Sequence, residues 1–195
     1  MGYSIEASGD SCYPNTTCLI NKFNIKDNDK LSQVEAEITF AKAVVLESET
    51  PHLPLDFDYY KNIHRFLFED LYDWAGKLRQ VDISKKGTSF CAVKELENLC
   101  EACFKRLEKE NYFKGVTKEI FVEEIVDFYV TTNYLHPFRE GNGRTQRIFI
   151  SKLIKYNGYE FNFSNINTDL LMIATIKAAN GVTDDLYAIF KNEIK

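Results

Sequence analysis

The chain has 195 residues, a length that fits one domain. Its apolar share of 45%, with 15 phenylalanines and 11 tyrosines, excludes a disordered chain. The net charge of −5 excludes a global basic field that would recruit nucleic acid or an anionic membrane. The sequence shows neither a secretory leader nor an apolar run of about 20 residues, so we expect a cytoplasmic protein without a membrane segment.

Apart from a first stretch, the chain has the hydrophobic spacing of helices. Residues 1–26 lack a sustained period and predict an arm packed on a single domain at 27–195. Residues 79–93 alternate instead, around Lys85-Lys86-Gly87, which predicts a β-hairpin. Helices are predicted at 29–47, 56–74, 94–110, 117–135, 144–157, 169–178 and 184–193. The sequence therefore predicts an all-α domain with one short hairpin.

The five cysteines are an odd number in a chain large enough to build a core without disulfides. We interpret them as reduced thiols. Cys100 and Cys103 could form a redox or zinc motif, but they lie three residues apart within a predicted helix, on the same face as its leucines. We therefore expect them to be core side chains.

One stretch departs from the packing pattern, namely His136-Pro-Phe-Arg-Glu-Gly-Asn-Gly-Arg-Thr-Gln-Arg147 between two apolar helices. Pro137 ends the first helix, and glycines at 141 and 143 let backbone amides turn toward one point. A glycine-rich turn that leads into a helix N-terminus binds anions. Arginines on the first turn of that helix suit several phosphates.

The remaining charged side chains of this stretch fit the same chemistry. Glu140 would repel a bare phosphate, so its place is explained if a divalent cation bridges the two. His136 is then a base beside the phosphates. Taken singly, each residue has a plainer interpretation: a surface histidine, or solvated arginines. A helical metal pair of His136 with Glu140 is disfavoured because Pro137 and the glycines indicate a loop.

This stretch resembles the Fic-domain signature, His-x-Phe-x-Asp/Glu-Gly-Asn-Gly-Arg-x-x-Arg, and fills all eight fixed positions. Other segments also resemble short bacterial Fic proteins, so that the resemblance covers most of residues 13–195. Those segments are 13–15, 63–68, 72–79 and 81–85.

The resemblance implies transfer of AMP from ATP to a Ser, Thr or Tyr hydroxyl of a target protein, with self-modification. It implies that His136 is the general base and that Glu140 holds Mg²⁺. It also implies an apolar anchor at Phe138. The implied phosphate-binding residues are Gly141, Asn142 and Gly143, which form an anion hole with the Asn142 side chain, and Arg144 and Arg147.

The hairpin gains an expected role from the same resemblance. In the family an equivalent flap holds the target backbone as an added strand. Lys86, Gly87 and Thr88 would form its tip, and Phe90 is a candidate clamp for the target. A hairpin that only docks on the surface is the alternative.

Two other functions compete with AMP transfer. Relatives that phosphorylate their targets carry a lysine near position 143, whereas Gly143-Arg144 follows the AMP-transfer pattern. An inert module that only binds peptides would not need His136 and Glu140. The resemblance to toxin-like bacterial proteins leaves the target unidentified.

Regulation in the family uses an inhibitory motif, Ser/Thr-x-x-x-Glu-Gly/Asn, whose glutamate pairs with the second signature arginine. No Ser or Thr here has Glu four residues later, and the nearest match is Ser32 with Glu35. Three possibilities stay open. A small antitoxin-like protein could supply a glutamate to Arg147, Glu35 of the same chain could contact Arg147, or the chain could lack this kind of inhibition. Ser32 and Glu35 could instead form a helix cap.

Overall fold

The structure is a computed structural model that describes residues 4–5, 11–85 and 88–195. Most of the chain is helical, as predicted. The helices are α1 (Asn28–Ser48), α2 (Phe57–Phe68), α3 (Val93–Lys109), α4 (Lys118–Leu135), α5 (Asn142–Tyr156), α6 (Thr168–Ala178) and α7 (Asp184–Glu193). Short 3₁₀ turns lie at Asn111–Phe113 and Phe163–Asn165. Except for the end of α2, each predicted helix lies within two residues of its observed bounds.

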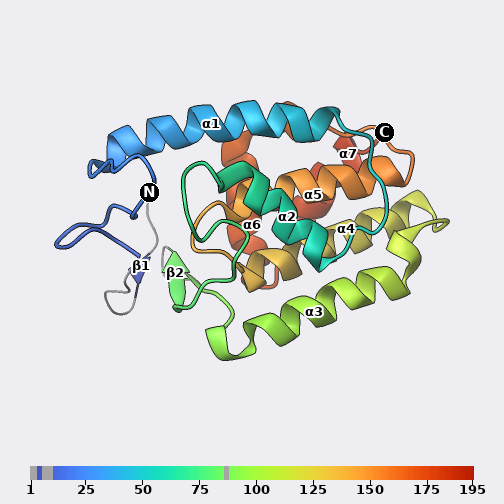
Figure 1. The fold of residues 1–195 in the computed structure, drawn as a ribbon. Helices are drawn as coiled ribbons and strands as arrows, with labels where there is room; N and C mark the ends of the chain where they lie inside the picture. Colours follow the sequence, from blue (N-terminus) through green and yellow to red (C-terminus); the bar gives the residue numbers. More distant parts are fainter. Residues whose placement is uncertain (1–3, 6–10, 86–87) are drawn as a thin grey trace.

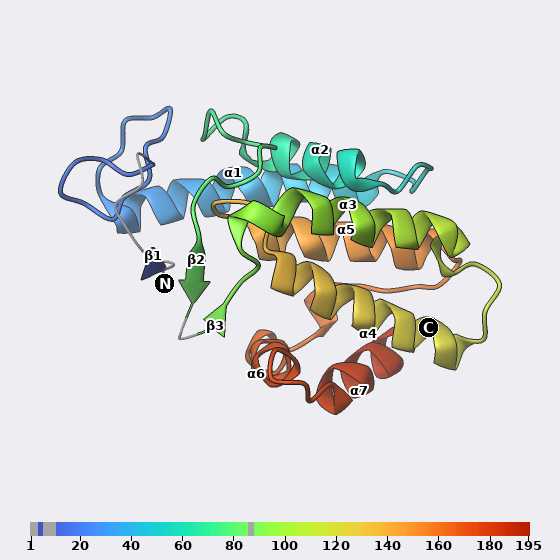
Figure 2. The ribbon, with the colours of Figure 1, turned by 90° about the horizontal axis from the view of Figure 1, so that it is seen from below.

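Helix α5 is the central element of the bundle. It packs against α1, α2 and α4, while α3 covers the outer side of α4 (Figure 1). Helices α6 and α7 pack on each other, and α7 packs on α4 (Figure 2). Because α5 is covered on several sides, most of its residues are buried, including polar ones such as Thr145 and Gln146.

Aromatic rings fill the space around α5. Phe149 is fully buried and contacts rings from three other helices: Tyr60 at 5.4 Å, Phe104 at 5.3 Å and Phe128 at 5.6 Å between centroids. Buried aromatic side chains of this size dominate the hydrophobic stabilisation of a core. The cluster fixes the position of α5 and therefore of the loop that precedes it.

Helix α2 ends at Phe68, and the prediction that it runs to 74 is wrong. The carbonyl of Phe68 accepts from the amides of both Leu71 and Tyr72 at 2.9 Å, so that the chain turns away from the helix axis. Leu71 and Tyr72 are nevertheless buried. The apolar spacing beyond Phe68 therefore results from the burial of these side chains, and not from a helical backbone.

The predicted hairpin is present but shorter than expected. Strand β2 (Ile83–Lys85) pairs antiparallel with β3 (Thr88–Ser89), and Lys86 and Gly87 of the expected tip lie outside the described residues. Strand β1 (Ser4–Ile5) pairs antiparallel with the other edge of β2, which gives the order β1-β2-β3. The sequence did not predict this third strand, because two residues carry no measurable alternation.

The segment before α1 is held on the bundle, since the amide of Lys22 donates to the Leu71 carbonyl at 2.9 Å. Asp27 caps α1 by accepting from the amide of Lys30 at 2.8 Å. The alternative cap of Ser32 with Glu35 is therefore wrong, because both residues lie inside α1.

All five cysteines are free thiols. Cys100 is fully buried, and burial raises the pKa of both Cys100 and Cys103 to about 12. Such thiols stay protonated and inert at neutral pH, as expected for core side chains.

Within the described residues, no helix combines the length and apolar character needed to cross a membrane.

Candidate functional site

The signature stretch forms the loop between α4 and α5. His136 is the C-cap of α4, in the left-handed conformation with φ 45° and ψ 59°. Phe138 is fully buried, and its ring stacks on His64 of α2 at 3.8 Å between centroids. The expectation that Phe138 is an apolar anchor is confirmed. The loop is therefore attached to the core at its centre, next to its charged residues.

The orientation of the His136 ring sets its chemistry. Its Nδ1 lies 3.0 Å from the backbone carbonyl of Asn133. A carbonyl oxygen only accepts, so Nδ1 carries the hydrogen, and in the neutral ring Nε2 carries the lone pair. The ring also stacks on Phe90, which follows β3, at 3.8 Å between centroids and 15° between planes. The hairpin segment therefore lies directly against the predicted base.

The side chain of Asn142 closes the loop on itself. Its Oδ1 accepts from the amide of Phe138 at 2.8 Å, and its Nδ2 donates to the Phe138 carbonyl at 2.7 Å. Both ends of this buried amide are thus used inside the loop. Asn142 fixes the shape of the loop between α4 and α5 in this structure. Its expected contact with phosphate stays a prediction.

Gly141 meets two requirements that exclude other residues. Its φ of +78° is in the left-handed region, and a Cβ would lie 2.1 Å from Cζ of Phe68. Its amide donates to Oε1 of Glu140 at 2.8 Å, while its carbonyl accepts from the amide of Thr145 in the first turn of α5. The loop and the start of α5 thus form one rigid unit over Phe68.

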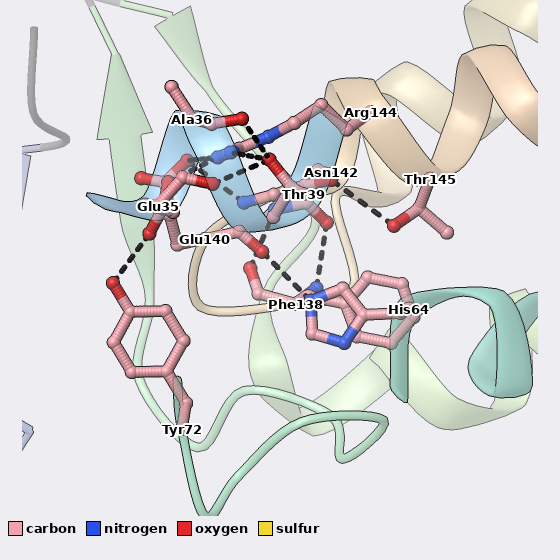
Figure 3. A network of polar contacts seen from close by, with 11 residues as sticks. Glu35, Ala36, Thr39, His64, Tyr72, Phe138, Glu140, Asn142, Arg144 and Thr145 are labelled. Atoms are coloured by element: carbon pink, nitrogen blue, oxygen red, sulfur yellow. Dashed lines mark hydrogen bonds and ion pairs between the residues drawn. The ribbon is translucent and has the colours of Figure 1, made fainter. Parts of the chain in front are cut away.

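The two signature arginines have different surroundings. Nη1 of Arg147 lies 3.3 Å from where a Cβ of Gly143 would be, and burial lowers the pKa of Arg147. Among the described residues, Arg147 makes no ion pair. Arg144 instead reaches α1, where Nη2 lies 2.5 Å from Oε1 of Glu35 (Figure 3). The possibility that Glu35 contacts Arg147 is therefore wrong: Glu35 pairs with the first signature arginine.

His64 is a site residue that sequence reasoning missed. Its Nδ1 accepts from the amide of Gly76 at 2.8 Å, so Nε2 carries the hydrogen and donates to the Glu140 carbonyl at 3.0 Å. Burial lowers the pKa of His64 to about 3, which keeps the ring neutral. The one signal in the sequence was a histidine on the apolar face of a predicted helix.

Arg79 is a second missed residue. Its buried guanidinium donates from Nε to the His136 carbonyl and from Nη1 to the Val81 carbonyl, both at 2.9 Å. It also donates to the carbonyl of Cys91 on the other side of the hairpin. Arg79 therefore ties both ends of the hairpin to His136, the predicted base. Nothing in its spacing distinguished it from a surface arginine.

The residues present fit a magnesium ion held jointly with a nucleotide. Mg²⁺ usually takes one or two carboxylates, with phosphates and water completing its shell. Glu140 offers one such carboxylate next to the start of α5. Within the described part of the chain, no group of three or more His, Cys, Asp or Glu side chains lies together, so a cage made of protein alone is not built here.

The expected flap residues are only partly described. Phe90 is placed against His136, whereas Lys86 and Gly87 are outside the described residues and Thr88 is placed only as part of β3. The predicted target contacts of these residues stay predictions.

Comparison with known proteins places this geometry in a family. Residues 54–154 match the Fic/DOC family. The chain is 35% identical to the "Probable protein adenylyltransferase Fic" of Escherichia coli K12 over 93% of this chain and 90% of that protein. It is 34% identical to the "Probable protein adenylyltransferase y4lH" of Sinorhizobium fredii, over 87% and 88% of the two chains.

Solved structures agree with the sequence relatives. The BepC effector of Bartonella tribocorum, determined with bound AMPPNP, has a TM-score of 0.89 and 28% identity, over 95% of this chain and 96% of that chain. An N-terminal Fic domain from Bartonella quintana with bound ADP has a TM-score of 0.89, also at 28% identity, over 95% and 94% of the two chains.

Proposed function

The chain belongs to the Fic/DOC family and is a protein adenylyltransferase, and we propose that it transfers AMP from ATP to a Ser, Thr or Tyr hydroxyl of a target protein. The nucleotide donor is supported by the ATP analogue bound to BepC, which shares the fold over nearly its whole length. Self-modification is part of the proposal, because the chain carries such hydroxyls itself.

The observation that carries the proposal is the orientation of His136. With Nδ1–H donated to the Asn133 carbonyl, Nε2 is the nitrogen that can accept the proton of the target hydroxyl. The hydroxyl oxygen then forms a bond to the α-phosphorus, and the bond from that phosphorus to the bridging oxygen breaks. The bonding electrons leave with pyrophosphate, and the proton stays on His136.

The phosphates are assigned to the start of α5. The amides of residues 141–143 and the positive end of the helix dipole favour an anion there, in a loop that Asn142 already holds in shape. Arg147 brings a partly buried positive charge next to Gly143, which suits the β- and γ-phosphates. When bound, Mg²⁺ neutralises the phosphate charge, and Glu140 is the residue proposed to hold it.

The hairpin is proposed to bind the target. Phe90 lies against the His136 ring, and Arg79 fixes both ends of the hairpin to the loop. A target segment paired with this sheet would therefore be held at a set distance from the base, which favours proton transfer from its hydroxyl.

Inhibition of the transfer activity by a separate, small antitoxin-like protein is also part of the proposal. Glu35, the internal candidate, pairs with Arg144, which leaves Arg147 for an external carboxylate. The free thiols fit a reducing bacterial cytoplasm as the proposed compartment.

The test is mass spectrometry of the purified chain after incubation with ATP and Mg²⁺, alone and in lysate of the host. An AMP adduct on the chain or on a lysate protein is the expected result. A phosphate adduct would indicate a phosphotransferase, and the absence of any adduct in both samples would indicate a binding module.

A further inference from the structure

Glu35 is the centre of a polar cluster, here called the Glu35 cluster, formed by Glu35, Thr39, Tyr72, Glu140 and Arg144 (Figure 3). Its residues come from α1, from the turn after α2, from the loop and from α5. Glu35 is only 9% exposed, although it lies on the first helix of the bundle. A buried carboxylate needs partners for both oxygens, and this one has them.

Both oxygens of Glu35 are used. Oε1 accepts from Nη2 of Arg144 at 2.5 Å, and Oε2 accepts from the hydroxyl of Tyr72 at 2.5 Å. Tyr72 is itself fixed, because its ring stacks on Trp74 at 4.3 Å between centroids. The carboxylate therefore has one orientation, which Tyr72 fixes by its hydrogen bond to the oxygen that does not face Arg144.

Arg144 is held on several sides by this arrangement. Its Nη1 donates to Oγ1 of Thr39 at 3.1 Å, and its guanidinium carbon lies 4.8 Å above the centre of the Phe68 ring. The same Nη2 that pairs with Glu35 lies 3.6 Å from Oε1 of Glu140. One guanidinium nitrogen thus stands between two carboxylates, and the nearer one comes from α1.

The distance between Arg144 and Glu140 matters because of what Glu140 does in the proposed function, on which this inference rests. At 3.6 Å the two side chains form an ion pair but no hydrogen bond. A guanidinium that moved to hydrogen-bond distance would occupy a carboxylate oxygen that Mg²⁺ requires. The side chain of arginine is long and flexible, so a small rotation would close the gap once the competing carboxylate is removed.

We propose that Glu35 is a positioning residue that anchors Arg144 on α1, and so keeps its guanidinium from moving from the present 3.6 Å to hydrogen-bond distance of Glu140. Tyr72 takes part by holding the second oxygen of the Glu35 carboxylate. A buried ion pair often adds no net stability to a fold. The positioning role therefore explains why a carboxylate is buried here.

The experiment measures binding of a non-hydrolysable ATP analogue by calorimetry at a series of Mg²⁺ concentrations. In Glu35→Gln the Mg²⁺ concentration for half-maximal binding should rise about tenfold, the size of one charge-assisted hydrogen bond. Binding of AMP without Mg²⁺ should not change, because the loop between α4 and α5 keeps its shape. Glu37→Gln, an exposed change of the same chemistry on α1, should behave as wild type.

Two further variants show whether Glu35 acts through Arg144. Tyr72→Phe removes only the hydroxyl and should give a smaller rise in the Mg²⁺ requirement, which also serves if Glu35→Gln does not fold. In an Arg144→Ala background, Glu35→Gln should change the requirement by less than about twofold, since the group it positions is gone.

The outcomes separate this inference from the proposed function. A wild-type chain that binds no analogue at any Mg²⁺ concentration would overturn both. If the wild type binds but Glu35→Gln has an unchanged or lower Mg²⁺ requirement, only the positioning role is wrong. An equal rise in the Arg144→Ala background would also overturn it, because Glu35 would then act by another route.

Discussion

At the scale of single residues, the backbone decides which nitrogen of His136 can act. The Asn133 carbonyl takes the Nδ1 hydrogen, so the lone pair of the neutral ring is at Nε2. Stacking on Phe90 limits how the ring can turn. The ring of the proposed base is thus oriented before any substrate binds.

His136→Ala should abolish transfer and leave nucleotide binding intact. General-base catalysis contributes about 10²–10⁴-fold in rate, and the alanine variant lacks the proton acceptor. The measurement is the rate of AMP incorporation beside the affinity for an ATP analogue. Retained transfer would remove His136 from the catalytic role, and lost analogue binding would show that it shapes the site instead.

His64 has a structural role and holds the loop as a buried, neutral ring. Its pKa is about 3 in the folded chain, against about 6.5 when unfolded. Below pH 6.5 the unfolded state binds a proton that the folded state does not. Its contribution to stability therefore falls as pH drops from about 6.5 toward 3.

From this difference, His64→Gln should flatten the pH dependence of stability. Between pH 7 and pH 5 the wild type should lose about 2 kcal/mol of unfolding free energy through this one residue, and the variant should not. Urea unfolding of both proteins at each pH measures the unfolding free energy. Parallel curves for the two proteins would mean that His64 is not buried as a neutral ring.

At the scale of elements, the start of α5 depends on a close approach between the loop and α2. Gly141 lies against the Phe68 ring at a positive φ, so both backbone strain and a steric clash oppose a side chain there. Gly158, just after α5, shares the positive φ, but no described heavy atom lies within 4 Å of its Cβ position. The two glycines therefore separate strain from clash.

Gly141→Ala should destabilise the chain more than Gly158→Ala does. The change at Gly158 should cost about 1 kcal/mol from strain alone. The change at Gly141 should cost about 1–3 kcal/mol more from overpacking against Phe68, and should also weaken binding of an ATP analogue. Chemical denaturation of both variants provides the comparison. Equal costs would contradict the close packing.

The elements also show what the sequence could predict. Helices with a clear apolar face, such as α3, were predicted to within two residues, because burial of one face follows the helical period. The end of α2 was not, since Leu71 continues the apolar spacing while the backbone already turns. Strand β1 was also missed, because its pairing with β2 is decided by tertiary contact alone.

At the scale of the whole molecule, the site is assembled from distant segments. The loop 136–147 was predicted from its sequence, because charges and glycines between apolar helices have no packing explanation. The residues that hold it were not predictable in the same way. Arg79, His64 and Glu35 meet the loop across 57 to 109 residues of chain, and no local spacing reports such contacts.

Glu35 shows this limit most clearly. Its sequence context indicated either a helix cap or a contact with Arg147. The fold places α1 against α5 so that the carboxylate faces the first turn of α5 and meets Arg144 instead. A difference of three residues along one helix changes the partner, and only the packing of the two helices decides it.

In the proposed function AMP, and not phosphate, is transferred to a protein hydroxyl, with His136 as the base. It is tested most directly with ATP labelled differently on its α- and γ-phosphates, incubated with Mg²⁺, the wild type or His136→Ala, and host lysate. We expect the α-label on protein, the γ-label in released pyrophosphate, and neither label on protein with the variant. A γ-label on protein, or equal α-labelling by both chains, would contradict it.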